Sequence, residues 1–150
     1  MNRAGISANT AAIASIMLVD DDEPLRRSLT ILLEQRGYEV AAYANPIEAV
    51  DAVAASRRRF DLVITDVRMP NMDGIHFLGI YRRAFPAVPV IVMTAFAGDL
   101  VRENETPEGA FAFLSKPLDV EQFLGVVRHA ISDAALWENP LVSVRSRGGR

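Results

Sequence analysis

Short hydrophobic runs alternate along the chain with longer segments of helical periodicity. Five runs are nearly continuous in apolar and β-branched residues and are expected to form strands: 15–20 (SIMLVD), 39–43 (EVAAY), 61–65 (DLVIT), 89–95 (PVIVMTA) and 110–115 (AFAFLS). A run without polar alternation is typical of a parallel sheet that is covered on both faces. The pattern therefore predicts βα units and an α/β fold.

The segments between these runs have helical spacing. Four of them predict helices: 22–38, 45–56, 74–84 and 119–132. In the first, Leu25, Leu29, Leu32 and Leu33 form one amphipathic stripe, and Gly37 stands where a C-terminal cap is expected.

The helix predicted at 45–56 has clear start signals. Asn45 is a suitable cap and Pro46 suits the first turn, so we expect Ile47, Val50 and then Val53 or Ala54 to face the sheet.

The segment 98–109 (GDLVRENETPEG) fits a helix poorly. Its only large apolar residues are Leu100 and Val101, and Pro107 removes a helical hydrogen bond. We expect a short, loosely held helix at roughly 98–105. The predicted architecture is a doubly wound (βα)5 parallel sheet with a short or irregular fourth helix.

Composition places the chain among ordinary globular proteins. A length of 150 residues favours one domain, which we assign to 14–132, with a flexible lead at 1–13 and a C-terminal tail at 133–150. The net charge of −3 argues against a nucleic-acid surface, and the absence of cysteine excludes disulfides and thiolate metal sites. No run approaches the roughly 20 apolar residues of a membrane span. We expect a cytoplasmic protein.

Polar residues follow the predicted strands at their carboxyl ends, where open parallel sheets bind ligands. The first run ends in Asp20 and is followed by Asp21 and Asp22, Asp66 follows the third run, the fourth ends in Thr94 and then Ala95, and the fifth ends in Ser115, which Lys116 and then Pro117 follow.

Carboxylates brought close together repel one another unless a cation lies between them. Mg²⁺ suits carboxylates, water and phosphate oxygens, and Lys116 adds a second positive charge. We interpret this edge as a site that holds a phosphoryl group against Asp66, with Thr94 as a hydrogen-bond donor. A carboxylate can serve as the covalent nucleophile for such a group.

Four motifs make the chain resemble a known family. VDDDEPLR (19–26), DLVITDVRMPNMDG (61–74), VIVMTA (90–95) and FLSKP (113–117) are similar, in order and spacing, to the receiver domains of two-component response regulators. The resemblance extends over about 14–132. It implies a flavodoxin-like sheet in the order 2-1-3-4-5 and a non-enzymatic signalling protein of the single-domain type.

The resemblance also implies roles for the acidic residues. Asp66 would be the phosphoacceptor. Asp21 and Asp66 would bind Mg²⁺ directly, together with the backbone carbonyl of Arg68, and Asp20 would act mainly through water. Asp22 falls at the variable position that follows the acidic pair.

The same resemblance implies how a phosphoryl group would be held. Thr94 would donate to one oxygen and Lys116 would pair with another, while backbone N–H groups of Arg68 and Ala95 complete the cradle. It also implies a cis Lys116–Pro117 bond.

A switch and partners follow from the resemblance as further expectations. The phosphoryl donor would be a histidine kinase or phosphotransfer protein. On phosphorylation Thr94 would move inward, Phe113 would follow, and 98–109 would rearrange. The output face, formed by the fourth helix, fifth strand and fifth helix, would then bind a downstream protein or a second copy. Arg68 and Phe96 would flank the path of the hydrolytic water and slow phosphate loss.

Two alternatives are weaker. A phosphatase of haloacid-dehalogenase type also uses an aspartate and Mg²⁺, but it requires an acidic residue where Arg68 stands. A nucleotide-binding domain lacks support because 74–79 (GIHFLG) is not followed by Gly-Lys.

His76 and His129 are not expected to be ligands. Since no DNA-binding module follows residue 132, we expect a stand-alone regulator or an excised receiver that does not bind DNA directly.

Overall fold

The computed structural model describes residues 13–56, 58–70, 72–95 and 109–137. Five parallel strands form one sheet in the order β2-β1-β3-β4-β5. Their bounds are β1 (Ser15–Val19), β2 (Glu39–Tyr43), β3 (Leu62–Asp66), β4 (Val90–Thr94) and β5 (Ala112–Ser115). The predicted flavodoxin-like strand order is confirmed, and all five strands lie within the runs that predict them, except that β3 extends by one residue to include Asp66.

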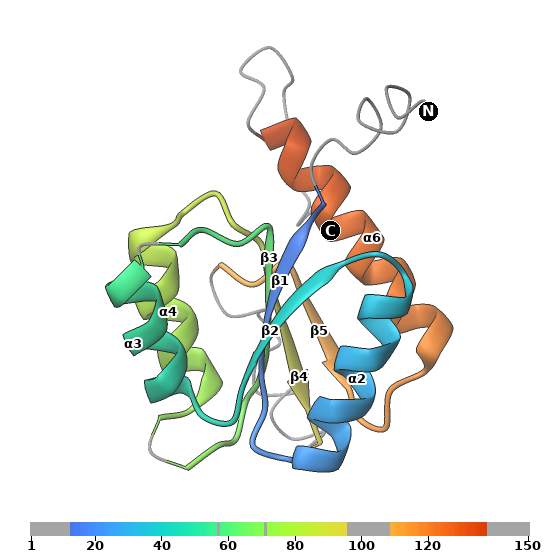
Figure 1. Cartoon of the computed structure of the whole chain (residues 1–150), viewed down its shortest axis with the longest axis horizontal. Coiled ribbons are helices and arrows are strands. Elements are labelled where there is room, and N and C mark those ends of the chain that lie inside the picture. Colours follow the sequence, from blue (N-terminus) through green and yellow to red (C-terminus); the bar gives the residue numbers. More distant parts are fainter. Residues whose placement is uncertain (1–12, 57, 71, 96–108, 138–150) are drawn as a thin grey trace, which may run out of the picture.

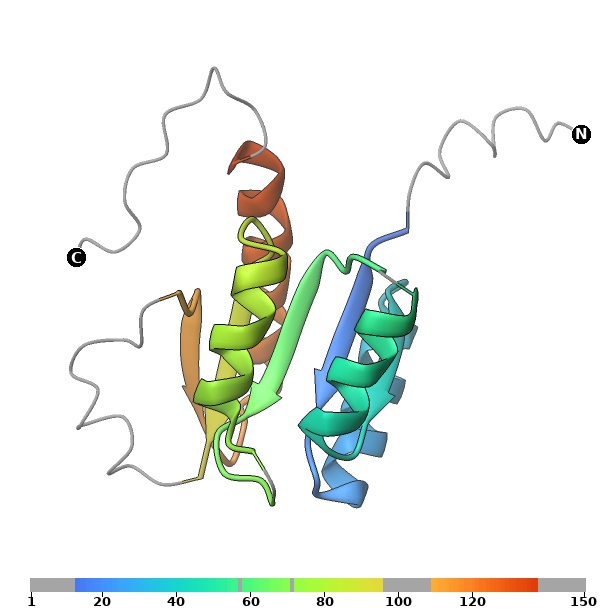
Figure 2. The same ribbon diagram turned by 90° about the vertical axis from the view of Figure 1, so that its left-hand side faces the viewer.

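Helices cover both faces of the sheet. The described helices are α2 (Glu23–Gln35), α3 (Pro46–Ser56), α4 (Gly74–Ala84) and α6 (Val120–Trp137). Helices α3 and α4 lie on one face and α2 and α6 on the other (Figures 1 and 2). This three-layer arrangement buries β1, β3 and β4 on both sides, which explains why their sequences lack polar alternation.

Alternate residues of each central strand enter two separate cores. Ile16 and Leu18 of β1 pack with α2 and α6, whereas Met17 and Val19 pack with α3 and α4. The two-residue period of a strand causes this division, because successive side chains point to opposite faces. The first core also contains Leu29 and Leu33, which belong to the predicted leucine stripe.

The C-terminal end of α2 follows the sequence signal at Gly37, and the N-terminal cap is Asp22, which the sequence did not single out. Asp22 caps its N-terminus by accepting a hydrogen bond from the Leu25 N–H at 3.2 Å. At the other end Gly37 has a φ of +93°, a left-handed conformation that glycine adopts without steric cost.

The inward face of α3 differs from the prediction. Ile47 is 43 % exposed, while Pro46 and Ala49 are buried and Val50 and Val53 pack against the core. The buried stripe therefore begins one residue earlier than predicted, and Ile47 lies about 100° around the helix from Pro46. The helix packs through small residues here, which apolar periodicity does not reveal.

The last helix continues to Trp137, beyond the end predicted at residue 132. The fourth helix expected at 98–105, and with it most of the segment 98–109, lies outside the described residues, as do 1–12 and 138–150.

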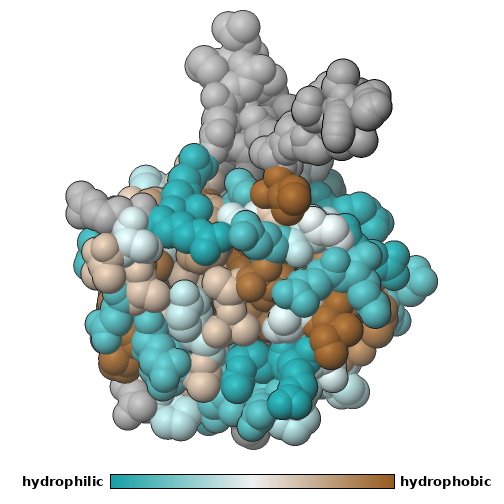
Figure 3. Space-filling view, in the orientation of Figure 1, coloured by the Kyte–Doolittle hydropathy of each residue, from teal (hydrophilic) through white to brown (hydrophobic). Residues whose placement is uncertain are grey.

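The described surface is mostly hydrophilic on the side that presents β2, with separate hydrophobic patches (Figure 3). The large hydrophobic residues that are exposed are Ile13, Ile31, Ile47 and Val120. Among the described helices, none combines the length and the apolar character needed to cross a membrane.

Candidate functional site

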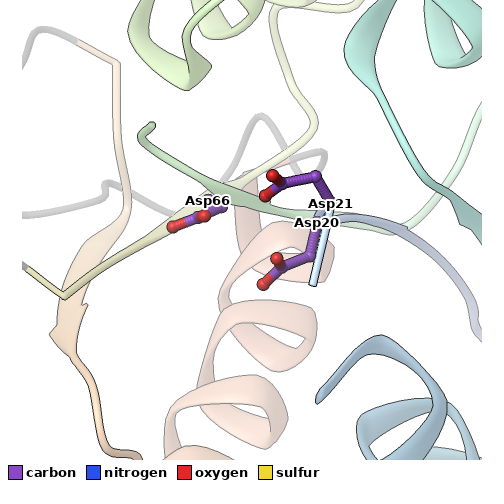
Figure 4. Close-up of side chains that lie close together, drawn as sticks. All are labelled: Asp20, Asp21 and Asp66. Atoms are coloured by element: carbon purple, nitrogen blue, oxygen red, sulfur yellow. The ribbon is translucent and has the colours of Figure 1, made fainter. Parts of the chain in front are cut away.

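Three aspartates meet at the carboxyl edge of the sheet. Strands β1 and β3 are neighbours with Val19 opposite Thr65, so Asp20 and Asp66, one residue further along each strand, lie side by side. Asp21 is the next residue after Asp20 and lies in the turn that follows β1. One carboxylate oxygen from each of Asp20, Asp21 and Asp66 lies within 4.8 Å of the others. Figure 4 shows the three side chains lying close together.

Asp20 is fully buried and held by several partners. Its backbone N–H donates to the Tyr43 carbonyl at 3.2 Å, which anchors the end of β1 to β2. Its Oδ1 accepts from the Asp22 N–H at 2.9 Å, and its Oδ2 accepts from the Lys116 ammonium at 3.1 Å. A buried charge needs such partners. Asp21, in contrast, is exposed at the mouth of the cluster.

Lys116 joins the strands across the cluster. Its Nζ lies 3.1 Å from Asp20 Oδ2 and 3.3 Å from Asp66 Oδ1, so a single cation contacts both carboxylates. The cis Lys116–Pro117 bond follows directly, as the family resemblance predicts. Lys116 also donates its backbone N–H to the Thr94 carbonyl at 2.8 Å, which fixes the end of β5 against the end of β4.

Burial and neighbouring charges shift the pKa values of Asp66 and Lys116. Burial first, and then the neighbouring Asp20 carboxylate, raise the pKa of Asp66 from 3.8 to about 6, although Lys116 opposes the shift. For Lys116, burial by itself lowers the pKa, but the carboxylates of Asp20 and Asp66 outweigh burial and raise the pKa above its ordinary value. Lys116 is therefore a permanent cation at neutral pH, and the deprotonated Asp66 carries a cost that a further cation would relieve.

The chain after Asp66 turns back against the strand tip. The Val67 N–H donates to Asp66 Oδ1 at 3.0 Å, and the Gly74 N–H donates to the Val67 carbonyl at 2.7 Å. A Cβ on Gly74 would clash with the Asp66 carbonyl oxygen, so only glycine permits this approach. Asp73 then caps α4 by accepting from the His76 N–H at 2.9 Å.

The role of Gly74 in the site was missed from the sequence, which identified it only as the last residue of the motif 61–74 and the first of the helix predicted at 74–84. A usable signal exists in retrospect, since a glycine opens a helix soon after a functional strand end. The close approach itself depends on the path of 67–73 and is not visible in any local pattern.

The remaining predicted site residues occupy the expected strand ends. Thr94 is buried at the end of β4, and Ala95, which follows it, is exposed. Arg68 is exposed two residues beyond Asp66. Phe113, predicted as a switch residue, is half-buried on β5 opposite Val92 and packs against the core on the α3 and α4 side.

Two other groups lie apart from the cluster. His76 and His129 are exposed on α4 and α6, and the ring of His129 contacts Phe111 edge-on at 6.3 Å between ring centroids. Phe96, which was expected to flank the site, lies outside the described residues.

The carboxylate cluster fits a hard divalent ion. Around Mg²⁺, ligands at about 2.1 Å from the metal stand roughly 3 Å apart when adjacent and roughly 4 Å apart when opposite. The oxygens of Asp20, Asp21 and Asp66 lie within 4.8 Å of one another, which needs only small movements to reach these spacings. The exposed Asp21 leaves one side open to the water molecules that Mg²⁺ retains.

Comparison with known proteins agrees with the fold and the motifs. A family model described as the response regulator receiver domain matches residues 16–128. This chain belongs to that family. It is thus a receiver domain of the kind found in two-component systems, in agreement with the resemblance carried by its four motifs.

Curated relatives of this receiver domain are longer regulators. It is 38% identical over 119 residues to the response regulator protein FleR of Pseudomonas aeruginosa, covering 79% of this chain and 25% of FleR. It is 33% identical over 125 residues to the DNA-binding transcriptional regulator NtrC of Escherichia coli, covering 83% of this chain and 26% of NtrC. The chain therefore spans about a quarter of the length of these relatives.

Solved receiver structures superpose along most of the chain. A receiver domain protein from Clostridium thermocellum matches with a TM-score of 0.76 and 29% identity, covering 83% of this chain and 99% of that one. The response regulator TrrA from Thermotoga maritima matches with a TM-score of 0.70 and 25% identity, covering 79% of this chain and 99% of TrrA. TrrA was solved in complex with Mg²⁺ and BeF.

Proposed function

We propose that this receiver domain accepts a phosphoryl group on Asp66 from a histidine kinase or phosphotransfer protein. The supporting observation is the carboxylate at the tip of β3, which has the Lys116 ammonium 3.3 Å away and the carboxylates of Asp20 and Asp21 beside it. A nucleophile, a fixed cation and a set of metal ligands thereby meet at one edge of the sheet.

The chemistry follows from the arrangement of donors around Asp66. Among the described residues, the Val67 N–H and the Lys116 ammonium both reach Oδ1 of the carboxylate. Oδ2 is then the oxygen that attacks phosphorus. The new O–P bond forms as the N–P bond of the donor phosphohistidine breaks, and the imidazole leaves with the electron pair.

Phosphoryl transfer depends mainly on positioning and on stabilising charge that spreads over the phosphoryl oxygens. Lys116 is held by Asp20 as well as by Asp66, so it keeps its position when the Asp66 carboxylate loses its charge on becoming an acyl phosphate. Thr94 at the end of β4 is the hydroxyl donor, and the N–H groups of Arg68 and Ala95 complete the cradle.

Asp21, Asp66 and the backbone carbonyl of Arg68 would hold Mg²⁺ directly, and Asp20 would act through water. When bound, the metal supplies positive charge that offsets the crowding of carboxylates and the charge of the transferring group. The raised pKa of Asp66, at about 6, is consistent with a site that lacks one positive charge in the protein alone.

The phosphorylated state would change a protein-binding face. Phe113 is only partly buried and lies on β5, the strand that leads to Lys116, in register with Val92 of β4. We assign the switch to Thr94 and Phe113, with the face of the fourth helix, β5 and α6 as the output surface for a downstream protein or a second copy. Direct DNA binding is not part of this proposal.

Phosphorylation is tested by intact mass spectrometry after incubation with acetyl phosphate and MgCl₂. Wild type should gain one phosphoryl group, and Asp66→Asn should gain none. Asp51→Asn, at an exposed position on α3, is the matched control and should behave as wild type. A phosphoryl gain on the Asp66→Asn protein equal to that of wild type would refute the assignment.

The donor class requires a second measurement. Autophosphorylated histidine kinases and phosphotransfer proteins are mixed with the receiver, and radiolabel is followed from donor to receiver. Transfer in seconds from one donor, absent with Asp66→Asn, is the expected result. Labelling by acetyl phosphate but by no phosphohistidine donor would contradict the donor assignment alone.

A further inference from the structure

The turn from β1 into α2 carries two of the three site aspartates, and its backbone is held at both ends. Asp20 is anchored by its N–H to the Tyr43 carbonyl, and Asp22 accepts the first helical hydrogen bond of α2, from the Arg26 N–H at 2.9 Å. Asp21 stands between these anchors and is itself exposed. Its direction therefore depends on how the peptides on either side of it are fixed.

The peptide that joins Asp20 to Asp21 is fixed by a side chain. Nη1 of Arg26 donates to the Asp20 carbonyl oxygen at 2.8 Å, reaching back from the first turn of α2. A peptide group is planar, so holding its oxygen also orients the N–H that belongs to Asp21. The Asp21 Cα lies in the same plane, so only φ of Asp21 and its side-chain torsions remain between the fixed plane and the carboxylate, and the bond restricts where that carboxylate can point.

Arg26 binds the backbone carbonyl of Asp20, so this hydrogen bond does not occupy the carboxylate oxygens of the site. The half-buried guanidinium brings a positive charge to a turn with three consecutive aspartates, which lowers their mutual repulsion. A cation that bound the Asp21 carboxylate instead would compete with a metal for the same oxygens. Arg26 thus combines a fixed hydrogen bond with a favourable charge.

We propose that Arg26 is a positioning residue that clamps the Asp20–Asp21 peptide and so presents Asp21 toward Asp66 for a divalent cation. The inference rests on the proposed phosphoacceptor function and extends it to a residue outside the phosphoryl cradle. Residues that orient metal ligands from outside the coordination shell typically contribute about 10-fold to 100-fold in metal affinity.

The test compares two adjacent arginines of α2. Arg26→Gln removes the clamp, whereas Arg27→Gln is the control, because Arg27 is exposed and pairs only loosely with Glu23 at 3.5 Å. Mg²⁺ affinity is measured by titrating ¹⁵N-labelled protein with MgCl₂ and following amide shifts. Arg26→Gln should weaken Mg²⁺ binding by about 10-fold, and Arg27→Gln should leave it unchanged.

A merely structural role of Arg26 is separated by two further readouts. Leu32→Ala loosens the packing of the same helix without touching the turn, so it should lower the unfolding midpoint and leave Mg²⁺ affinity unchanged. In the metal-free state, amide exchange at Asp21 and Asp22 should accelerate in Arg26→Gln and not in Leu32→Ala. If Arg26→Gln does not fold, Arg26→Met keeps the apolar stem without the donor and should show the same loss of affinity.

The possible results are distinct. Wild-type Mg²⁺ affinity in both Arg26 variants would overturn the inference, as would an equal loss of affinity in Leu32→Ala. A different result would show that the proposed function is wrong: the wild-type protein would neither bind Mg²⁺ nor gain a phosphoryl group. Wild type that is phosphorylated normally, with Arg26 variants that bind Mg²⁺ normally, would overturn the role of Arg26 alone.

Discussion

The raised pKa of Asp66 makes a quantitative prediction about stability. In the folded protein this pKa is about 6, compared with 3.8 ordinarily, so the folded state binds a proton at Asp66 more tightly than the unfolded state does. Raising the pH from below 3.8 through 6 therefore destabilises the folded protein, and the penalty is complete above pH 6. The amide introduced by Asp66→Asn carries no charge at any pH and would escape this penalty.

The size of the effect follows from the shift. The difference from 3.8 to about 6 is roughly 2.2 pKa units, which corresponds to about 3 kcal/mol at 1.36 kcal/mol per unit. Because the Asp66 side chain is only 10% exposed, solvent screening removes little of this value. In the absence of divalent cations, Asp66→Asn should thus be more stable than wild type by about 3 kcal/mol at pH 8, falling to about 1 kcal/mol at pH 4.5.

The assay is urea denaturation in EDTA, followed by circular dichroism at both pH values. Asp51→Asn, which removes an exposed carboxylate from α3, should match wild type at each pH. Excess MgCl₂ should stabilise wild type by mass action and should have little effect on Asp66→Asn. Equal stability of wild type and Asp66→Asn at pH 8, or a difference that does not change with pH, would refute the electrostatic reasoning.

Two further substitutions test contacts at the two ends of β3. Gly74→Ala places a Cβ against the Asp66 carbonyl oxygen, so the free energy of unfolding should fall by about 2 to 3 kcal/mol and phosphorylation by acetyl phosphate should slow. Gly79→Ala on the same helix meets nothing within 4 Å and should instead stabilise by about 0.5 to 1 kcal/mol, and equal effects of the two would contradict the close approach. Asp61→Ala removes the acceptor of the Ser15 N–H at 2.8 Å and should cost about 1 to 3 kcal/mol in urea titrations, whereas Asp61→Asn, which keeps an oxygen acceptor, should recover much of the loss. An Asp61→Ala protein as stable as wild type would show that this bond contributes nothing net.

Local sequence patterns were sufficient for the elements and for the edge at which the site forms. Continuous apolar runs identify β1, β3 and β4 because these strands are buried on both faces, and the cap signal of Gly37 appears at the C-terminal end of α2. In a parallel sheet all strands end at the same side, so polar residues after the strands converge without any knowledge of distances.

These patterns did not predict correctly which residues of α3 are buried. The stripe was predicted to include Ile47, but Ala49 and Pro46 are buried instead. Which residues of a helix are buried depends on how the helix lies on the sheet and on its neighbours, and apolar periodicity alone does not determine this.

By itself, the sequence determined the order of the strands and helices along the chain. It also determined that Asp20, Asp21, Asp66 and Lys116 lie at one edge of the sheet. Only the tertiary structure decided how these groups interact: that one ammonium contacts two carboxylates, that burial raises the pKa of Asp66, and that Arg26 reaches the Asp20 carbonyl. The physical reason is that the strength of a charge interaction or a hydrogen bond depends on the distance between the two groups, and a change of about 1 Å is enough to alter it. Lys116 and Asp20 are 96 residues apart in the chain, and only folding brings them to 3.1 Å.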